Sequence, residues 1–408
     1  MLPILAPVLL AASVVTAPTT HAEPGIAPDA IRIGGVMDLE GRARGLGQGM
    51  RTGIEAAFEG ERIDDRKLEF VTMNDSYDPP KTIEATEDMI SDGVLMMVGN
   101  VGTPTAKVSL PLLAQNSVPA VGFFTGAGLL RPGRGDIVNY RASYVQETER
   151  VISTALDAGA GLQPSEICAY VQNDAYGMAG VTGIKRALSG YGGTGAIIER
   201  LDEILRADGE TPERNGIGPV GVYVRGSVRA RQGYLSLKQW ERDQNTECRL
   251  VVTVGAYGPI AEFAGYSRYK GDDWLLSAVS FTGADNLRIA LRDLRINNRV
   301  IMTQVVPHES STLPVVQAAK EKLGERYGYV SLEGYIVGRM TVEALRRIDG
   351  PITREAFLDS ILGSGMAIGG LQLDFTEDNQ GSDLVVSTIL EDGEFVLMED
   401  SRGRTILQ

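Results

Sequence analysis

The chain has 408 residues, of which 43% are hydrophobic and 23% charged, so it can bury a large core, and its length favours two domains over one. Its formal net charge is −14 at pH 7. A surface with that charge repels phosphate backbones and anionic lipid headgroups, which argues against nucleic acid as a partner.

The first 22 residues predict an export leader. They contain no charged side chain, run apolar from Leu2 to Val15 and end in the small-x-small pattern Thr20, His21, Ala22. We expect cleavage after Ala22 and a periplasmic mature protein that is not embedded in a membrane, because prolines break this segment and no later one is long enough to span. A disordered or membrane-anchored N-terminus is the alternative, since the usual positive n-region is missing.

The next unit has the pattern of an α/β sheet. A strand-like run from Ile31 to Met37 is followed by the glycine-broken loop Gly41 to Gly49, an amphipathic segment to Phe58 and a second strand at Leu68 to Met73. In open α/β sheets, ligands bind where loops leave the carboxyl ends of the strands. The pattern therefore favours a protein that holds a small molecule.

Strand and helix patterns alternate through most of the remaining chain, which predicts parallel sheets with helical crossovers. Further strands are expected at residues 94–99, 118–124, 166–172, 196–201, 250–255, 274–279 and 300–305, and helices at 103–115, 146–158, 177–189, 233–244 and 259–270. Helical patterns at 314–327, 333–348 and 354–362 follow, and then antiparallel strand patterns at 371–375, 385–390 and 394–398. The region 202–233 does not fit this rhythm and predicts a looped excursion with one short strand.

These series imply two similar α/β lobes, each with a mainly parallel sheet flanked by helices. The chain leaves the second lobe near Pro307, adds helices to the first and then returns. We expect residues 1–22 to form the signal peptide, 23–143 with 307–368 lobe 1, and 144–306 with 369–408 lobe 2.

Histidine and cysteine usage narrows the chemistry. His21 and His308 are the only histidines, so after cleavage any histidine-based triad, acid/base pair or metal site would depend on His308. We expect no catalytic residue, no metal and no cofactor. Cys168 and Cys248 lie beside apolar runs, and they are either two buried free thiols or a disulfide, which requires their two strands to be neighbours.

Several short segments, in order and over nearly the whole mature chain, resemble the Leu/Ile/Val-binding proteins, which are type I periplasmic binding proteins of ABC transporters. The segments are Ile31 to Gly34 with its glycine loop, Asn74 to Pro79, Val98 to Asn100, Val118 to Val121, Asn173 to Gly177 and Gly255 to Tyr257. The resemblance implies two lobes joined by three hinge crossings that close on a ligand. It also implies an ABC permease as partner, and we expect a monomer.

The resemblance also implies a ligand site. Thr103 and Thr125 stand where the family's hydroxyl residues bind the ligand carboxylate, and the Phe123 backbone stands where a carbonyl contacts the ligand ammonium. A hydroxyl just before a helix near Pro104 suits an anion because the helix dipole favours negative charge there. The alternative for each threonine is an ordinary cap or turn residue.

Aromatic side chains are expected to close this site. Tyr176 and Tyr257 follow strands of the second lobe and would shield the ligand from water. Tyr144, Phe281 and Leu46 are further candidate walls, for which hinge or core packing is the alternative.

One departure from the family bears on the ligand. The amino-acid binders place an acidic residue near the segment Ser277 to Phe281, which here contains no carboxylate before Asp285. A buried ammonium without a partner is costly. We therefore expect an amino-acid-like carboxylate, an aromatic acid, an amide or a urea-like solute rather than a standard zwitterionic amino acid.

Three functions compete on the sequence alone. The chain is a solute receptor for an ABC importer, or a periplasmic sensor that presents its ligand to a membrane receptor or kinase, or, more distantly, a dinucleotide-dependent enzyme. A G-x-G-x-x-G fingerprint from Gly45 would need glycine at position 50, which is Met50. The importer receptor is the function that the sequence favours.

Overall fold

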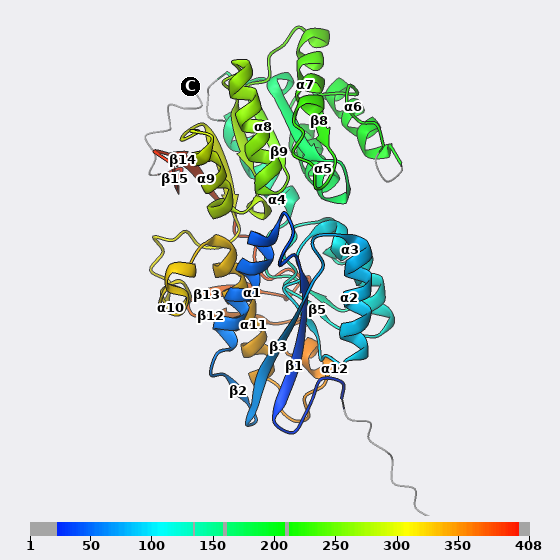
Figure 1. Ribbon diagram of the computed structural model, residues 1–408, viewed down its shortest axis with the longest axis vertical. Coiled ribbons are helices and arrows are strands. Elements are labelled where there is room, and N and C mark those ends of the chain that lie inside the picture. Colours follow the sequence, from blue (N-terminus) through cyan, green and yellow to red (C-terminus); the bar gives the residue numbers. More distant parts are fainter. Residues whose placement is uncertain (1–22, 134, 158–160, 209–211, 400–408) are drawn as a thin grey trace, which may run out of the picture.

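The computed structural model describes residues 23–133, 135–157, 161–208 and 212–399. Two α/β lobes follow one another along the long axis of the molecule (Figure 1). Each has a mostly parallel sheet with helices against it, which confirms the predicted fold class. The predicted leader, residues 1–22, lies outside the described residues.

Lobe 1 is built on a sheet with the strand order β2-β3-β1-β4-β5-β6. Its strands are β1 (Ala30–Met37), β2 (Arg62–Ile63), β3 (Arg66–Asn74), β4 (Met97–Val98), β5 (Ala120–Val121) and β6 (Ile137–Val138). All pairs are parallel except β2 with β3, and β1 pairs with β3 from Ala30 opposite Lys67 to Met37 opposite Asn74. The carboxyl ends of these strands face lobe 2 (Figure 1).

The helices of lobe 1 come from both ends of the chain. They are α1 (Arg44–Phe58), α2 (Pro79–Ser91), α3 (Thr103–Gln115), α10 (Pro314–Leu323), α11 (Tyr329–Arg346) and α12 (Arg354–Asp359). Helices α1 and α11 lie on one side of the strands, and α2 and α3 on the other (Figure 1). Glycines allow α1 and α11 to touch, because a Cβ on Gly53 would lie 2.1 Å from the Ser331 carbonyl oxygen.

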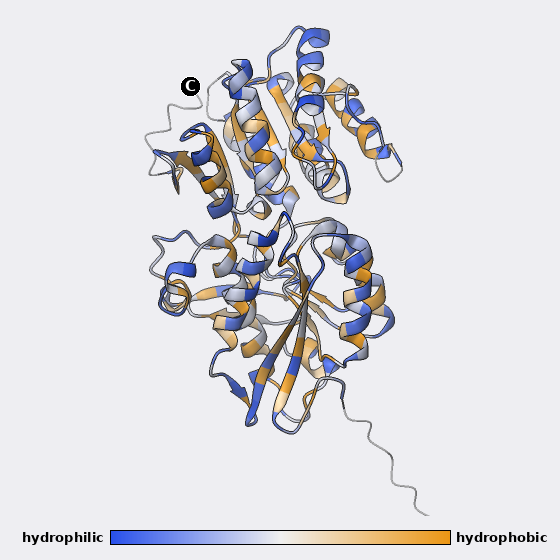
Figure 2. Ribbon diagram, viewed as in Figure 1, coloured by the Kyte–Doolittle hydropathy of each residue, from blue (hydrophilic) through white to orange (hydrophobic). Residues whose placement is uncertain are grey.

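Lobe 2 has the strand order β15-β14-β11-β10-β9-β7-β8. Its strands are β7 (Ile167–Gln172), β8 (Val220–Tyr223), β9 (Leu250–Val254), β10 (Leu275–Ala278), β11 (Val300–Gln304), β14 (Val386–Glu391) and β15 (Glu394–Leu397). Its helices are α4 (Tyr144–Asp157), α5 (Ala175–Ser189), α6 (Gly195–Arg206), α7 (Arg231–Gln244), α8 (Tyr257–Lys270) and α9 (Ala284–Asp293). Apolar residues gather on the strands and on the helix faces turned toward them (Figure 2).

Cys168 and Cys248 form a disulfide, with their Cα atoms 5.7 Å apart. Strands β7 and β9 are parallel neighbours, with Cys168 opposite Val251. The disulfide therefore joins β7 to the residues just before its neighbour β9, and the alternative of two free thiols is wrong.

One predicted element is wrong. The run 196–201 is not a strand, because it lies in α6. Ile197, Leu201 and Ile204 recur at helical spacing and form the buried face of that helix. The 202–233 excursion does contain one short strand, β8, at the edge of the sheet beside β7.

The chain passes between the lobes three times, after β6, after β11 and before β14. The hairpin of β12 (Gly365–Ile368) and β13 (Leu371–Asp374) belongs with lobe 1, since β12 packs on α11 and Gly369 accepts a backbone hydrogen bond from Val315. A bridge between Asn139 and Gln380 brings the first and third crossings together. Residues 369–380, assigned to lobe 2 from the sequence, thus lie beside lobe 1, because the apolar face of this hairpin packs there. Within the described part of the chain, no helix is long and apolar enough to span a membrane.

Candidate ligand-binding site

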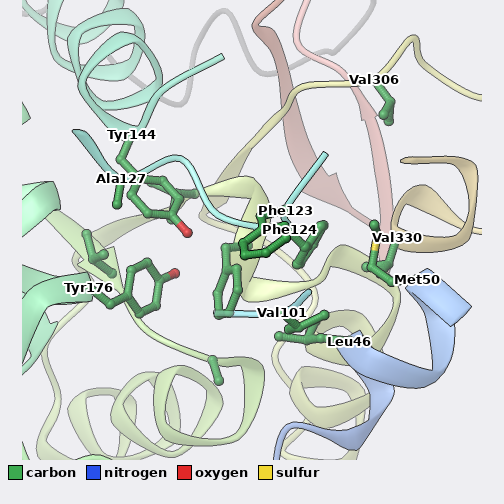
Figure 3. Close-up of a cluster of buried hydrophobic side chains, with 14 of the residues drawn as sticks. Leu46, Met50, Val101, Phe123, Phe124, Ala127, Tyr144, Tyr176, Val306 and Val330 are labelled. Atoms are coloured by element: carbon green, nitrogen blue, oxygen red, sulfur yellow. The ribbon is translucent and has the colours of Figure 1, made fainter. Parts of the chain in front are cut away.

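Four of the sequence-predicted site residues lie in one cluster of buried side chains: Leu46, Phe123, Tyr144 and Tyr176 (Figure 3). Seven of the eight are at most 2% exposed: Leu46, Thr103, Phe123, Thr125, Tyr144, Tyr176 and Phe281. The eighth, Tyr257, is partly exposed and lines a neighbouring cavity instead.

The two threonine hydroxyls meet each other. Thr103 is the first residue of α3, Thr125 follows β5, and their Oγ1 atoms are 2.7 Å apart. Gly102 precedes the helix with φ +111°, a conformation that favours glycine, and a Cβ there would lie 2.3 Å from the Tyr77 ring. The pair thus sits at a helix N-terminus, where an anion is favoured.

The Phe123 carbonyl group already has a hydrogen-bond donor within lobe 1. Its carbonyl oxygen accepts a hydrogen bond from the Thr125 amide at 2.8 Å. The tight turn at Gly122, with φ +56°, holds this segment against Val337 of α11.

Aromatic rings from both lobes pack together beside the threonines. The Phe281 ring of lobe 2 is the centre, with centroid distances of 4.8 Å to Tyr176, 5.2 Å to Phe124, 6.2 Å to Tyr77 and 6.5 Å to Tyr144. Figure 3 shows Tyr144 and Tyr176 side by side, and their centroids are 5.1 Å apart. Burial raises the pKa of Tyr144 to about 12, so the phenol stays neutral. We call these five rings the aromatic cluster.

An open cavity of about 630 Å³ lies between the lobes next to this cluster. Tyr77 borders both, and its hydroxyl accepts a hydrogen bond from Gln172 of lobe 2 at 3.3 Å. The cavity is lined from lobe 1 by Asp38, Arg42, Arg44, Ser76 and Asp78 among others, and from lobe 2 by Arg225, Val228 and Tyr257. The Asp38 carboxylate already accepts hydrogen bonds from the backbone of the glycine loop. Arg44 donates to the Gly41 carbonyl, and Arg225 lies 3.9 Å from the Asp174 carboxylate. The cavity is therefore lined by side chains of both charges.

A buried charge cluster lies against two rings of the aromatic cluster, Phe124 and Tyr144. Arg141, in the first crossing, is 1% exposed, and its guanidinium lies over the Phe124 ring, 4.7 Å from the centroid. Its Nη2 is 3.6 Å from Glu147 Oε1, and its Nη1 is 3.6 Å from Glu333 Oε1. Nη2 also donates to the Ser280 hydroxyl.

The two carboxylates of this cluster differ in the hydrogen bonds that they accept. Glu147, on α4, accepts hydrogen bonds from Ser280 N at 2.7 Å, Ser280 Oγ at 2.9 Å and Thr303 Oγ1 at 2.5 Å. Glu333, on α11, faces Arg141 across the lobe junction. Burial raises the pKa of Glu333 to about 7, against the lowering effect of Arg141. Burial lowers the pKa of Arg141, but Glu333 and Glu147 outweigh it, so the guanidinium stays charged.

The sequence reasoning missed this cluster. It found no carboxylate in the segment 277–281, and the structure brings one to Ser280 from α4 instead. The sequence did contain a sign of this cluster. The buried face of one helix carries a glutamate, Glu147, together with Tyr144, Val151 and Ala155. A charged residue on such a face needs a partner. No local pattern points to Arg141 or Glu333 as that partner.

Comparison with known proteins agrees with this architecture. A family model described as "Periplasmic binding protein" matches residues 30–201. The crystal structure of a possible leucine/isoleucine/valine-binding protein from Rhodopirellula baltica SH 1 is 30% identical, with 93% of this chain and 99% of that chain covered and a TM-score of 0.77. No curated protein sequence matches the chain. The chain therefore belongs to the type I periplasmic binding proteins, the family of the Leu/Ile/Val-binding proteins.

More distant structures share the fold. A fatty acid ABC transporter substrate-binding protein from Thermomonospora curvata is 16% identical over 94% of this chain and 96% of that chain, with a TM-score of 0.72. An R. palustris solute-binding protein in complex with 4-hydroxybenzoate is 17% identical over 90% of this chain and 95% of that chain, with a TM-score of 0.70. At this identity the likeness concerns the fold.

Proposed function

We propose that the protein is a periplasmic receptor that binds a small carboxylate-bearing or amide solute between its lobes and delivers it to an ABC importer. The observation that carries the proposal is the meeting of both lobes around one buried site. Hydroxyls and rings from lobe 1 face rings from lobe 2 beside a cavity that opens to solvent. Solutes named for distant relatives, a fatty acid and 4-hydroxybenzoate, are carboxylates that fit this chemistry.

Binding is coupled to hinge closure in this proposal. Lobe 1 offers Thr103 and Thr125 in the open state, and lobe 2 adds Tyr176 and Phe281 on closing, with Tyr257 at the mouth. Contacts between the lobes support such a closed state, since Gln172 reaches Tyr77 and Asp285 accepts a hydrogen bond from the Tyr329 amide at 3.0 Å. A solute favours closure only through the contacts that it gains there. No group in this mechanism acts chemically on the solute.

A thermal-shift screen tests the proposal. The panel holds amino acids, aromatic acids, short-chain carboxylates, amides and ureas, because a solute that binds only the folded protein raises its stability by about 2.7 kcal/mol at a hundred times Kd. Calorimetry on each hit should give one solute per chain, and mass spectrometry should recover the solute unchanged. A panel without any hit, or a released product, would contradict the proposal.

Export is tested separately. Mass spectrometry of the protein from the periplasmic fraction of an expressing Gram-negative host should find an N-terminus at Glu23. Retention of residues 1–22, or protein found only in the cytoplasm, would contradict it.

A further inference from the structure

Tyr77 lies in a turn of lobe 1 whose backbone is strained. Ser76 and Tyr77 have φ values of 53° and 58°, in the left-handed region that residues other than glycine seldom adopt. The Tyr77 amide donates to Asp75 Oδ1 at 2.9 Å. The Ser76 amide donates to Asn74 Oδ1 at 3.0 Å. Strain of this kind persists only where the surrounding structure fixes it, and it is common at ligand sites and switches.

The Tyr77 side chain reaches from lobe 1 to lobe 2. On lobe 1 its ring packs against Gly102, where a Cβ would lie 2.3 Å from the ring. On lobe 2 its ring centroid is 6.2 Å from that of Phe281, and its hydroxyl accepts a hydrogen bond from Gln172 Nε2 at 3.3 Å. Because the ring is held in lobe 1, it makes the two contacts with lobe 2 only when the lobes are together.

Gln172, the last residue of β7, is oriented by lobe 2 itself. Its Nε2 also donates to Asp174 Oδ2 at 2.8 Å, and its Oε1 accepts from the Tyr223 hydroxyl at 3.4 Å. These two partners fix which way the amide faces, and they leave the second Nε2 hydrogen for Tyr77. Gln172 is 1% exposed, so a loss of the Tyr77 hydroxyl would leave a buried donor without its acceptor.

We propose that Tyr77 fastens the closed protein, and that its hydrogen bond to Gln172 and its ring contact with Phe281 slow the release of a solute held between the lobes. The inference rests on the proposed function and adds the residue that controls how long the solute stays. Tyr77 and Gln172 both line the interlobe cavity, so their hydrogen bond joins its lobe 1 wall to its lobe 2 wall. A contact that forms only on closure acts on dissociation, because the solute meets the protein while the lobes are apart.

Stopped-flow kinetics of Tyr77→Phe test the inference, since this change removes the hydroxyl and keeps the ring. The probe is the solute that binds the unmodified protein most tightly among leucine, 4-hydroxybenzoate, 4-methylpentanoate, benzamide and urea. Its dissociation should become about three- to tenfold faster, as expected for one lost hydrogen bond, and its association rate should stay the same. Tyr223→Phe is the matched control, because it removes a hydroxyl from the same Gln172 within lobe 2 and should change neither rate.

A double-mutant cycle separates fastening from a general loss of structure. Gln172→Met removes the other partner of the bond, so adding Tyr77→Phe to it should not speed dissociation further. Urea unfolding shows whether each variant is folded. Unchanged dissociation in folded Tyr77→Phe, an equal acceleration in Tyr223→Phe, or additive effects in the cycle would overturn the inference and leave the proposed function intact. Binding of none of the five solutes would overturn both.

Discussion

The replacement Thr103→Val probes the hydroxyl pair directly. It removes a fully buried hydroxyl whose hydrogen bond to Thr125 is 2.7 Å long, and leaves the Thr125 hydroxyl accepting only from the Ala127 amide at 3.3 Å. Without solute, the loss of one such bond costs about 1 kcal/mol of unfolding free energy. In the complex, a hydrogen bond to a charged carboxylate contributes about 1.5–3 kcal/mol. At 1.4 kcal/mol per factor of ten, Kd should rise about 10- to 100-fold.

Thr105→Val is the matched control on the same helix. Thr105 is also buried, but its hydroxyl donates to the carbonyls of Val101 and Gly102 rather than to the other threonine. Calorimetry against an acid from the screen gives Kd for both variants, and urea unfolding gives their stability. A folded Thr103→Val with Kd within twofold of the unmodified protein, or an equal loss in Thr105→Val, would refute the assignment of the hydroxyl pair to the site.

Three further predictions address the mouth, the disulfide and the charge cluster. Tyr257→Ala should weaken solute binding at least tenfold while urea unfolding is unchanged, because this ring lines the cavity and is partly exposed; unchanged calorimetric affinity would remove it from the site. Changing Cys168 and Cys248 to serine should lower the unfolding free energy by about 2–4 kcal/mol in urea, since the disulfide closes a loop with a sequence separation of 80, and an unchanged midpoint would contradict this. The pKa of Glu333 is about 7 in the folded protein and 4.5 for an ordinary glutamate. Between these pH values the folded protein binds this proton more tightly than the unfolded chain does, so the unfolding free energy falls as the pH rises. Glu333→Gln should flatten that part of the stability curve, and parallel curves would show that the residue does not titrate there.

Local sequence patterns predicted many of the helices and strands. Helix α3 begins and ends at the predicted residues, and β1, β3 and β7 lie within a residue or two of expectation, because each combines a clear periodicity with a glycine or proline boundary. The error at α6 shows the limit. The run Ala196 to Ile198 is apolar enough for a strand, and only the recurrence of buried residues further along the segment identifies the helix.

The site was predictable only where the resemblance pointed to single positions. The hydroxyls of Thr103 and Thr125 meet in lobe 1, and the rings of Tyr176 and Phe281 meet in lobe 2, although the members of each pair come from separate segments of the chain. Whether they bind the solute stays a prediction. Arg141 has partners 6, 139 and 192 positions away in Glu147, Ser280 and Glu333, and two of these depend on how the lobes meet. Such contacts depend on tertiary packing, so no local sequence pattern predicts them.

Small-angle X-ray scattering during solute titration tests the central claim most directly. If two hinged lobes enclose the solute, the scattering curve should move toward that calculated for the compact arrangement in Figure 1, with a smaller radius of gyration, and should stop changing at one solute per chain. A solute that saturates the protein by calorimetry and leaves both the curve and the radius unchanged would contradict binding by lobe closure.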